Sequence, residues 1–433
     1  MSQRAGRQRI GIIGKDGRTS AIRQRLEASP RVDEVIVLSA GRGRAGVEQA
    51  IEAARLQRPD MVVVSPEEPL ALGVVDAIQG ELGIPCIGPT RSLARLESSK
   101  AFTRRLLATH GIAGNPRHRI FRTLDGIEPY LVELGEYVVK PDGLTGGKGV
   151  KVSGEHLRSL AEGLDYCREV LAHDHACVVV EERLEGEEFS LQSFCDGTHV
   201  ADMVVVQDHK RAHDGDTGPN TGGMGSYTCA DHLLPFIDAR TLGDASAINA
   251  RIAGALLRET GERYRGILFG GFMATADGVR LLEYNARFGD PESLNVLSLL
   301  ETDLFEVFEA MVEERLDRVP LRFKRQASVC RYLVPNGYPV NPVPGMLNNV
   351  PHATERLRVF TAAVEDRGTE GLWMTGSRAL ALVGLGDTLE EANRVADTAA
   401  ASVQGPAFYR RDIGAQALID RRIAHMRALR AGV

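Results

Sequence analysis

The middle of the chain contains the segment Lys140-Pro-Asp-Gly-Leu-Thr-Gly-Gly-Lys-Gly149, called here the glycine segment, directly after a short apolar run typical of a strand. Glycine lets consecutive backbone N–H groups point into one concavity, which suits the oxygens of a polyphosphate. The segment is not a Walker A loop, because Asp142 occupies the first glycine position and Gly149 stands where Ser or Thr would contact the metal. A tight hairpin is the alternative, but the lysines that bracket the glycines favour phosphate binding.

A second informative segment, Leu281-Leu-Glu-Tyr-Asn-Ala-Arg-Phe-Gly-Asp-Pro-Glu292, ends a predicted strand. Side chains alternate along a strand, so Glu283 and Asn285 are expected on one face, opposite Leu282 and Tyr284. A carboxylate and an amide oxygen side by side suit Mg²⁺ that is shared with phosphates, rather than zinc.

Arg287 continues the face of Glu283, where its charge is placed to neutralise a phosphoryl group during transfer. A Glu-x-Asn pair alone is common on solvated strands, so the metal interpretation depends on the glycine segment. Together the lysines, the two oxygen ligands and the arginine predict phosphoryl-transfer chemistry.

Two further glycine-rich segments allow different interpretations. Asp214-Gly-Asp-Thr-Gly-Pro-Asn-Thr-Gly-Gly-Met-Gly225 suits neither a helix nor a central strand, so we expect a long ordered loop that binds a small polar ligand. Gly41-Arg-Gly43-Arg-Ala-Gly46, with Asp60 further on, matches the dinucleotide-binding pattern. That pattern belongs after the first strand of such a domain, whereas this match follows the second, which favours an ordinary or substrate-facing loop.

The composition excludes several classes of protein. The 433 residues include 52 Lys and Arg against 58 Asp and Glu, a formal net charge of −6, which argues against a nucleic-acid binder with a basic surface. No apolar run approaches the roughly 18 residues that a membrane span needs, and the basic N-terminus lacks the apolar stretch of a secretory signal. We therefore expect no nucleic-acid or membrane partner.

The cysteines and histidines do not predict a metal site. The six cysteines are scattered without a C-x-x-C pair, which indicates reduced, mostly buried thiols and a cytoplasmic protein. Two histidine pairs, His173 with His175 and His209 with His213, are interpreted as surface or hydrogen-bonded residues rather than zinc ligands.

The order of predicted elements indicates three parts. Strands over 9–14, 34–38, 61–65 and 85–88 alternate with helices over 19–28 and 47–56, which predicts a doubly wound α/β domain. The middle is α+β, with helices over 100–109 and 246–260 and strands over 137–140, 177–181, 188–194, 203–207, 266–275 and 280–284. Prolines and glycines over 335–344 mark a junction. A strand over 379–383 and helices over 389–400 and 412–430 follow it.

The glycine segment and the segments 214–225 and 283–292, with four others, resemble the ATP-grasp superfamily. The others are Ser99-Lys-Ala-Phe-Thr103, Val180-Glu-Glu-Arg-Leu-Glu-Gly-Glu-Glu188, Gln207-Asp-His-Lys-Arg211 and Arg410-Arg-Asp-Ile-Gly414. Within that superfamily the chain is similar to the phosphoribosylamine–glycine ligase family over about residues 10 to 413, most specifically over 214–225. The resemblance implies a doubly wound domain over 1–99, an ATP-grasp domain over 100–330 with a small lid lobe over about 118–187, and a C-terminal α+β domain over 331–433.

The same resemblance implies that ATP, with Mg²⁺ or Mn²⁺, lies between two small α+β lobes. Lys100 and Lys140 would contact the phosphates, and the loop of Gly146, Gly147, Lys148 and Gly149 would close over them. The stretch with Glu181, Glu182 and Leu184 would meet adenine, and Glu188 the ribose hydroxyls. Glu283 and Asn285 match the metal ligands, and Lys148 and Arg287 are the expected catalytic cations.

The implied reaction belongs to purine biosynthesis. ATP phosphorylates a carboxylate, that of glycine, and an amine attacks the acyl phosphate to give an amide, ADP and phosphate; the closed loop excludes water that would hydrolyse the acyl phosphate. We expect small-molecule partners and a monomer or small homo-oligomer. The residues expected to bind the substrates are Gly14, Gly17, Arg18, Asp216, Pro219, Asn220, Thr221, Gly222, Gly223, Met224, Arg287 and Asp290.

Departures from the family pattern concentrate near the N-terminus. The family signature Gly-x-Gly-Gly-Arg-Glu-His-Ala is here Gly14-Lys-Asp-Gly-Arg-Thr-Ser-Ala21, and Ala40-Gly-Arg-Gly43 replaces a Pro-Gly-Asn loop. Both loops normally help to hold the phosphoribosyl amine, and Asp16 would repel a phosphate unless Lys15 or Arg42 offsets it. A further change, Thr375-Gly-Ser-Arg378 in place of a two-glycine motif, lies in the C-terminal domain.

Two ligase interpretations remain: the purine enzyme with a divergent loop, or a paralogue of specialised metabolism that uses another amine or carboxylate. An NAD-dependent oxidoreductase would rest on the Gly41–Gly46 match alone. A non-catalytic nucleotide-binding protein is disfavoured because Lys148, Glu283, Asn285 and Arg287 are all present.

Overall fold

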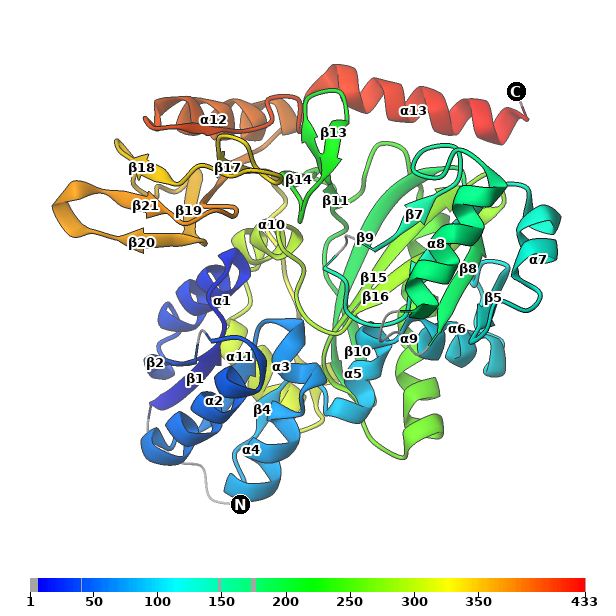
Figure 1. Cartoon of the computed structure of the whole chain (residues 1–433). Helices are drawn as coiled ribbons and strands as arrows, with labels where there is room; N and C mark the ends of the chain where they lie inside the picture. The colour runs from blue at the N-terminus through cyan, green and yellow to red at the C-terminus, as the bar shows by residue number, and fades with distance from the viewer. Residues whose placement is uncertain (1–6, 40, 147–148, 173–176, 433) are drawn as a thin grey trace.

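The computed structural model describes residues 7–39, 41–146, 149–172 and 177–432 (Figure 1). The chain begins with a parallel sheet in strand order β2-β1-β3-β4, formed by β1 (Gln8–Ile13), β2 (Val32–Ser39), β3 (Met61–Val64) and β4 (Cys86–Ile87). Met61 and Val63 belong to one apolar cluster with side chains of α1 (Gly17–Glu27). Val62 and Val64 belong to another, with α2 (Gly43–Gln57) and α4 (Val74–Leu82). Burial on both faces explains the continuous apolar strands and confirms the doubly wound arrangement.

The middle of the chain folds into two antiparallel sheets. One has the order β5-β8-β6-β7 and packs on α7 (Ile127–Leu134) and α8 (Leu160–Ala172). Its strands are β5 (His118–Phe121), β6 (Tyr137–Pro141), β7 (Lys151–Val152) and β8 (Val178–Glu182). The other has the order β10-β9-β15-β16 and packs on α9 (Ala239–Thr260). Its strands are β9 (Glu187–Asp196), β10 (Val200–Asp202), β15 (Arg265–Thr275) and β16 (Gly278–Asn285).

A fourth sheet joins the middle of the chain to its C-terminal part. Its main path is β11-β14-β17-β22-β19, so β11 (Gln207–Asp208) and β14 (Gly225–Thr228) pair into the same sheet as β17 (Ala327–Pro335), β22 (Leu380–Gly386) and β19 (Leu357–Thr361). The helix α12 (Leu389–Ser402) covers β22 and β17. A three-stranded sheet of β18 (Gly345–Leu347), β21 (Leu372–Met374) and β20 (Val364–Asp366) and the short strand β23 (Ala407–Phe408) complete this part.

The remaining helices position the ends of these sheets. They are α3 (Glu67–Ala71), α5 (Arg91–Ser98), α6 (Lys100–Thr109), α10 (Glu292–Leu299), α11 (Leu304–Val312), α13 (Gln416–Ala431) and the 3-10 turns η1 (Leu316–Arg318) and η2 (Gly368–Glu370). In the described part of the chain, no helix has the length and apolar character that crossing a membrane requires.

Two predicted elements differ from the structure. The strand predicted over 203–207 is wrong: this buried apolar stretch makes only the isolated bridge Ser190↔Val206 before β11 begins at Gln207. The segment 214–225 is not all loop, because β13 (Thr217–Asn220) pairs with β12 (Arg211–His213) in a hairpin. An exposed hairpin tolerates glycine and proline better than a central strand does, which is why the composition concealed it.

Candidate active site

The glycine segment is anchored to the start of α6. The Asp142 carboxylate accepts hydrogen bonds from Ser99 Oγ and from the backbone N–H of Ala101, both at 3.1 Å. Lys100 Nζ donates to the carbonyl of Gly143 at 2.8 Å. Asp142, which stands where a Walker A loop has its first glycine, therefore ties the glycine segment to the start of α6, where Lys100 lies.

The far end of the glycine segment is held by a tyrosine. Tyr166 donates its hydroxyl to the carbonyl of Gly149 at 2.7 Å, and Gly146 has a φ of +57°, which favours glycine. Gly147 and the predicted catalytic Lys148 lie outside the described residues. The described ends show how the segment is fixed on both sides.

A buried carboxylate organises the lysines that are expected to meet phosphate. Glu181 is 3% exposed and pairs with Arg104 at 2.6 Å and with Lys140 at 2.8 Å. Burial alone would raise the pKa of Glu181, but the Arg104 guanidinium and the Lys140 ammonium hold it at about 2. Burial lowers the pKa of Lys100, while Glu283 nearby opposes that change. Two lysines and one exposed carboxylate thus face a common region.

The strand that carries the predicted metal ligands is bulged. The register between β15 and β16 shifts next to Leu282, so the expected alternation fails there: Tyr284 is buried, but Leu282 is only half-buried. The Leu282 carbonyl accepts hydrogen bonds from Lys140 Nζ at 3.0 Å and from Arg104 Nη2 at 2.9 Å. The bulge therefore joins the strand of Glu283 to the lysine of the glycine segment.

The donor set of the predicted metal site fits a magnesium-type ion. Glu283 is exposed, and its carboxylate makes no hydrogen bond or ion pair with any residue that the structure describes. Asn285 Oδ1 accepts a hydrogen bond from Arg287 at 3.1 Å. Within the described ranges no group of three His, Cys, Asp or Glu side chains suffices to hold a metal alone. A carboxylate and an amide oxygen suit an ion that completes its shell with phosphate oxygens and water.

Arg287 is held by carboxylates of the first domain. It pairs with Glu97 of α5 at 2.9 Å and with Glu67 of α3 at 3.3 Å, and Glu67 also pairs with Arg18 at 3.2 Å. Burial alone would raise the pKa of Glu67, but the Arg287 and Arg18 guanidinium groups lower it to about 2. No motif in the sequence pointed to either glutamate.

Sequence reasoning did not assign Lys210 and Asp208 to the site, although their segment contributed to the resemblance. Lys210 Nζ lies 2.6 Å from Glu188, and its charge lowers the pKa of that carboxyl. Burial raises the pKa of Asp208, and Glu188 and Glu283 act in the same direction. These mutual interactions define one charged cluster, formed by Lys100, Lys140, Glu188, Asp208, Lys210 and Glu283.

A second polar group joins the middle of the chain to the C-terminal domain. Arg378 donates to the carbonyls of Gly222 at 2.5 Å and Gly223 at 3.2 Å, and it pairs with Asp290 at 3.0 Å. Tyr332 donates its hydroxyl to the other oxygen of Asp290 at 2.6 Å. The structure thus brings three of the predicted substrate residues together around Arg378.

The rest of the segment 214–225 has mixed exposure. Pro219 and Asn220 are exposed on β13, whereas Met224 is fully buried. Thr221 donates its hydroxyl to the backbone carbonyl of Lys210 at 2.8 Å, so the hairpin is tied to the charged cluster.

Asp216 lies on another side of the hairpin, against the C-terminal segment. Its carboxylate is within 2.9 Å of Arg410, 2.6 Å of Arg421 and 2.9 Å of Arg422. The structure therefore places the Asp216 carboxylate among three arginines, and not around Arg378 with Gly222, Gly223 and Asp290.

The divergent N-terminal loop caps its own helix. Asp16 is the N-cap of α1 and accepts a hydrogen bond from the Thr19 N–H at 2.9 Å, and the Thr19 hydroxyl accepts one from the Asp16 N–H at 3.4 Å, which completes a capping box. The cation that pairs with Asp16 is Arg18, at 2.7 Å, a partner that was not considered from the sequence beside Lys15 and Arg42. Replacement of the family Glu by Thr19 thus has a local structural reason.

Residues of that loop that match the family signature pack against the other two domains. Arg18 is buried and donates to the carbonyl of Phe288 at 3.0 Å. Gly17 lies against the C-terminal domain, where an added Cβ would be 1.9 Å from the Tyr332 hydroxyl. Gly14 has a φ of +134°, which explains its glycine.

Of the predicted adenine residues, Glu181 is buried in its ion pairs with Arg104 and Lys140, and Glu182 and Leu184 lie at the end of β8 and just beyond it. Glu182 pairs with Arg117 at 2.9 Å, and Leu184 is half-buried. The six cysteines are free and five are buried, as expected.

The histidine interpretation is wrong for His209, which is 1% exposed and has no hydrogen-bond partner on either ring nitrogen among the described residues. His213 is exposed, with its ring 5.7 Å from that of Phe408. His173 and His175 lie outside the described residues.

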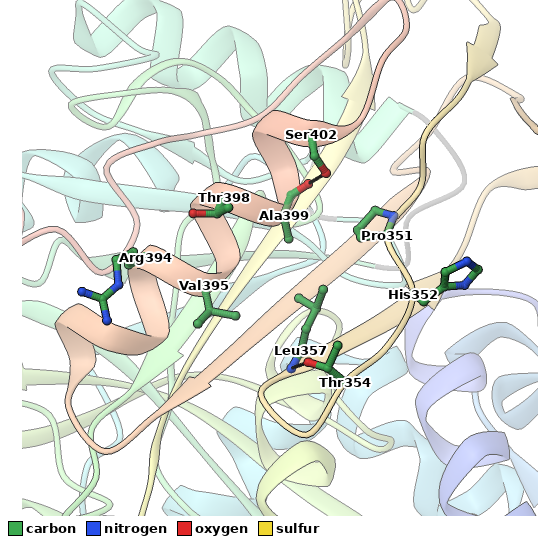
Figure 2. Close-up of a pocket in the computed structure, with 9 residues that line it drawn as sticks. All are labelled: Pro351, His352, Thr354, Leu357, Arg394, Val395, Thr398, Ala399 and Ser402. Carbon is green, nitrogen blue, oxygen red and sulfur yellow. Dashed lines mark hydrogen bonds between the residues drawn. The ribbon is translucent and has the colours of Figure 1, made fainter.

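A hollow of about 450 Å³ lies in the C-terminal part, between α12 and the segment 351–357 (Figure 2). Its lining is Pro351, His352, Thr354, Leu357, Arg394, Val395, Thr398, Ala399 and Ser402. None of these lining residues belongs to the predicted ATP, metal or substrate positions.

Three family models match successive parts of the chain. They describe the N domain, the ATP-grasp (A) domain and the C domain of phosphoribosylglycinamide synthetase, and they match residues 8–97, 98–293 and 328–416. The matches follow the order of the three folded parts.

Similar proteins agree with these matches. The phosphoribosylamine–glycine ligase of Methanocella arvoryzae is 42% identical over 98% of this chain and 100% of its own length. That of Methanoregula boonei is 48% identical over 84% of each chain. The crystal structure of the phosphoribosylamine–glycine ligase of Thermotoga maritima has a TM-score of 0.78 at 27% identity and covers 94% of this chain and 100% of its own. The chain therefore belongs to the phosphoribosylglycinamide synthetase family of ATP-grasp ligases.

Proposed function

We propose that this protein couples glycine to phosphoribosylamine at the expense of ATP, forming an amide, ADP and phosphate. The observation that carries the proposal is the charged cluster. It gathers lysines from α6, from the glycine segment and from the β11 region around the exposed carboxylate of Glu283. A site of alternating cations and carboxylates suits a nucleotide polyphosphate better than an uncharged ligand.

The cluster supports a division of labour in the first step. Lys100 and Lys140 neutralise the charge of the phosphates, and the Glu188 carboxylate accepts hydrogen bonds from the ribose hydroxyls. Glu283 and Asn285 would hold Mg²⁺ or Mn²⁺, which supplies charge neutralisation when it is bound. A glycine carboxylate oxygen attacks the terminal phosphorus of ATP, the bond to ADP breaks, and Arg287 offsets the charge that develops.

The second step needs the amine and the acyl phosphate in one place. The amine nitrogen attacks the acyl carbon, phosphate leaves with its electron pair, and the nitrogen loses a proton. The group around Arg378 and Asp290 is where the three domains meet, and it supports binding of the amine there. Positioning of the two reactants supplies most of the rate enhancement.

An ADP-release assay tests this proposal. ADP should form only when ATP, a divalent metal, glycine and phosphoribosylamine are all present, with one amide formed for each ADP. Glycinamide ribonucleotide should be identified by mass. ADP release that needs glycine but not phosphoribosylamine would overturn the assignment of the amine.

A second candidate is supported by Asp16. Its carboxylate occupies the N-terminus of α1, the position where a helix otherwise attracts an anion. This favours a paralogue whose amine carries no phosphate near α1. The same assay with a panel of unphosphorylated amines separates the two candidates, because only a paralogue should turn over such an amine faster than phosphoribosylamine.

A further inference from the structure

The C-terminal helix α13 packs against the side of β9 that is opposite the charged cluster. Glu187 and Glu188 are consecutive residues of β9, so their side chains face opposite ways. Glu188 pairs with Lys210 at 2.6 Å. Glu187 instead pairs with Arg422 of α13 at 2.5 Å and with His425 at 2.7 Å. In Figure 1, α13 is the red helix that extends from the C-terminal domain past β13.

The same division recurs one segment later. Lys210 contacts Glu188, whereas its neighbour His209 is buried near Arg422, Arg410 and Asp216. Burial and the arginine charges lower the pKa of His209 to about 3, so its ring is neutral. Glu187 and His209, which precede Glu188 and Lys210 in the sequence, thus both lie near α13 or the segment that leads into it.

Arg422 connects the two segments. Its side chain is 15% exposed, and it pairs with Glu187 at 2.5 Å and with Asp216 of the β12–β13 hairpin at 2.9 Å. Ion pairs with so little exposure are weakly screened by solvent. A single guanidinium therefore links β9 directly to the hairpin that follows Lys210.

We propose that Arg422 is a positioning residue for the nucleotide. By fixing Glu187 and Asp216 it sets the separation of Glu188 and Lys210 on the other side of the same segments. The inference rests on the proposed function for the role of Glu188. The C-domain family model ends at residue 416, so it matches only the first residue of α13 (Gln416–Ala431).

Arg421 provides a matched control. It pairs with the same oxygen of Asp216 at 2.6 Å, but it is 53% exposed and does not pair with Glu187 in the described structure. Arg421→Met and Arg422→Met remove the same charge from adjacent positions of one helix. Only the second removes an ion pair of Glu187, which then keeps His425 as its partner on α13.

The test measures the KM for ATP and for glycine, kcat and the melting temperature of each variant. Arg422→Met should raise the KM for ATP about tenfold and leave the KM for glycine nearly unchanged, the size expected of coupling through a packed network. Arg421→Met should change the KM for ATP less than about twofold, as for an exposed pair. Arg422→Lys should restore part of the affinity, because it keeps the charge but not the fork of donors.

An unchanged KM for ATP in Arg422→Met would overturn the proposal, and so would an equal rise in Arg421→Met. If Arg422→Met does not fold, Glu187→Gln keeps the shape of the contact partner and removes its charge. It should show the same selective rise, and its absence would refute the idea. Calorimetric titration of the unmodified protein with ADP distinguishes failure of this inference from failure of the proposed function, because a protein that binds no ADP refutes the proposed function itself.

Discussion

Arg104 and Glu181 form a bidentate ion pair, with N–O distances of 2.6 and 2.8 Å, and each side chain is 3% exposed. The pair joins α6 to β8, and Arg104 also donates to the carbonyl of Leu281 in β16. One arginine thus holds both lobes beside the glycine segment. Two charges at such low exposure stabilise the fold only while both partners are present.

Arg104→Met should therefore destabilise the protein by about 3–5 kcal/mol, because it leaves Glu181 buried with Lys140 as its remaining ionic partner. Urea denaturation measures the change. Arg117→Met is the control, since Arg117 is 63% exposed and pairs with the next residue, Glu182. It should leave stability nearly unchanged. Equal losses in the two variants would contradict the role assigned to the buried pair.

Glu292 predicts a pH dependence of stability. Burial, together with Asp208, raises the pKa of this carboxyl from 4.5 to about 8. The folded state therefore keeps the proton that the unfolded state loses. This stabilisation is complete below about pH 4.5 and is lost as the pH rises to about 8. Relative to Glu292→Gln, which does not titrate, the unmodified protein should lose stability across that range in denaturation series.

The control for that experiment is Glu128→Gln, which removes an exposed glutamate from the first turn of α7 just as Glu292 lies in the first turn of α10. Its difference from the unmodified protein should not change with pH by a comparable amount. A flat difference for Glu292→Gln would show that its carboxyl ionises normally in the folded protein.

Glu283→Ala should reduce metal-dependent ADP release at least about 100-fold, as for the loss of a group that stabilises transition-state charge. Glu283 is exposed, so the melting temperature should stay the same. Glu365→Ala, at an exposed position of β20, should affect neither quantity. Undiminished ADP release in Glu283→Ala would refute the assignment of Glu283 as a metal ligand.

Asp16→Gly restores the family residue and removes an N-cap. Loss of the cap to glycine should cost roughly a few tenths of a kcal/mol of stability, and the KM for an anionic amine should fall because a negative charge leaves the end of α1. Asp238→Gly removes an equivalent Asp–Thr cap from α9, where Thr241 N–H donates at 2.8 Å. It should show the stability loss without the change in KM, measured by denaturation and steady-state kinetics. An equal KM for the anionic amine in both variants would show that Asp16 does not influence binding of that substrate.

The sequence predicted the fold well where each segment obeyed one period. The strands of the first sheet are apolar on both faces, and α6 (Lys100–Thr109) begins and ends at the predicted residues because Ser99 caps it. The bulge at Leu282 could not be predicted, because one extra residue in a strand leaves no trace in composition. The hairpin of β12 and β13 was concealed by its glycines and proline, which indicated a loop although an exposed hairpin tolerates them.

For the candidate site, local motifs predicted the residues that stand in glycine-rich or strand-end contexts, such as Lys140 and Glu283. They did not predict partners that are distant in sequence. Glu67 and Glu97 reach Arg287 only through the packing of the first domain on the second. Arg422 reaches Glu187 across more than half of the chain. Long-range pairing of charges is a property of the packed structure and carries no local pattern.

The close approach of Gly17 to the hydroxyl of Tyr332 makes the first and third domains depend on each other. Any larger residue at position 17 would force the third domain away and break the bond from Tyr332 to Asp290. A change on either side of this contact therefore requires a compensating change on the other side, even though the two domains are the two ends of the chain.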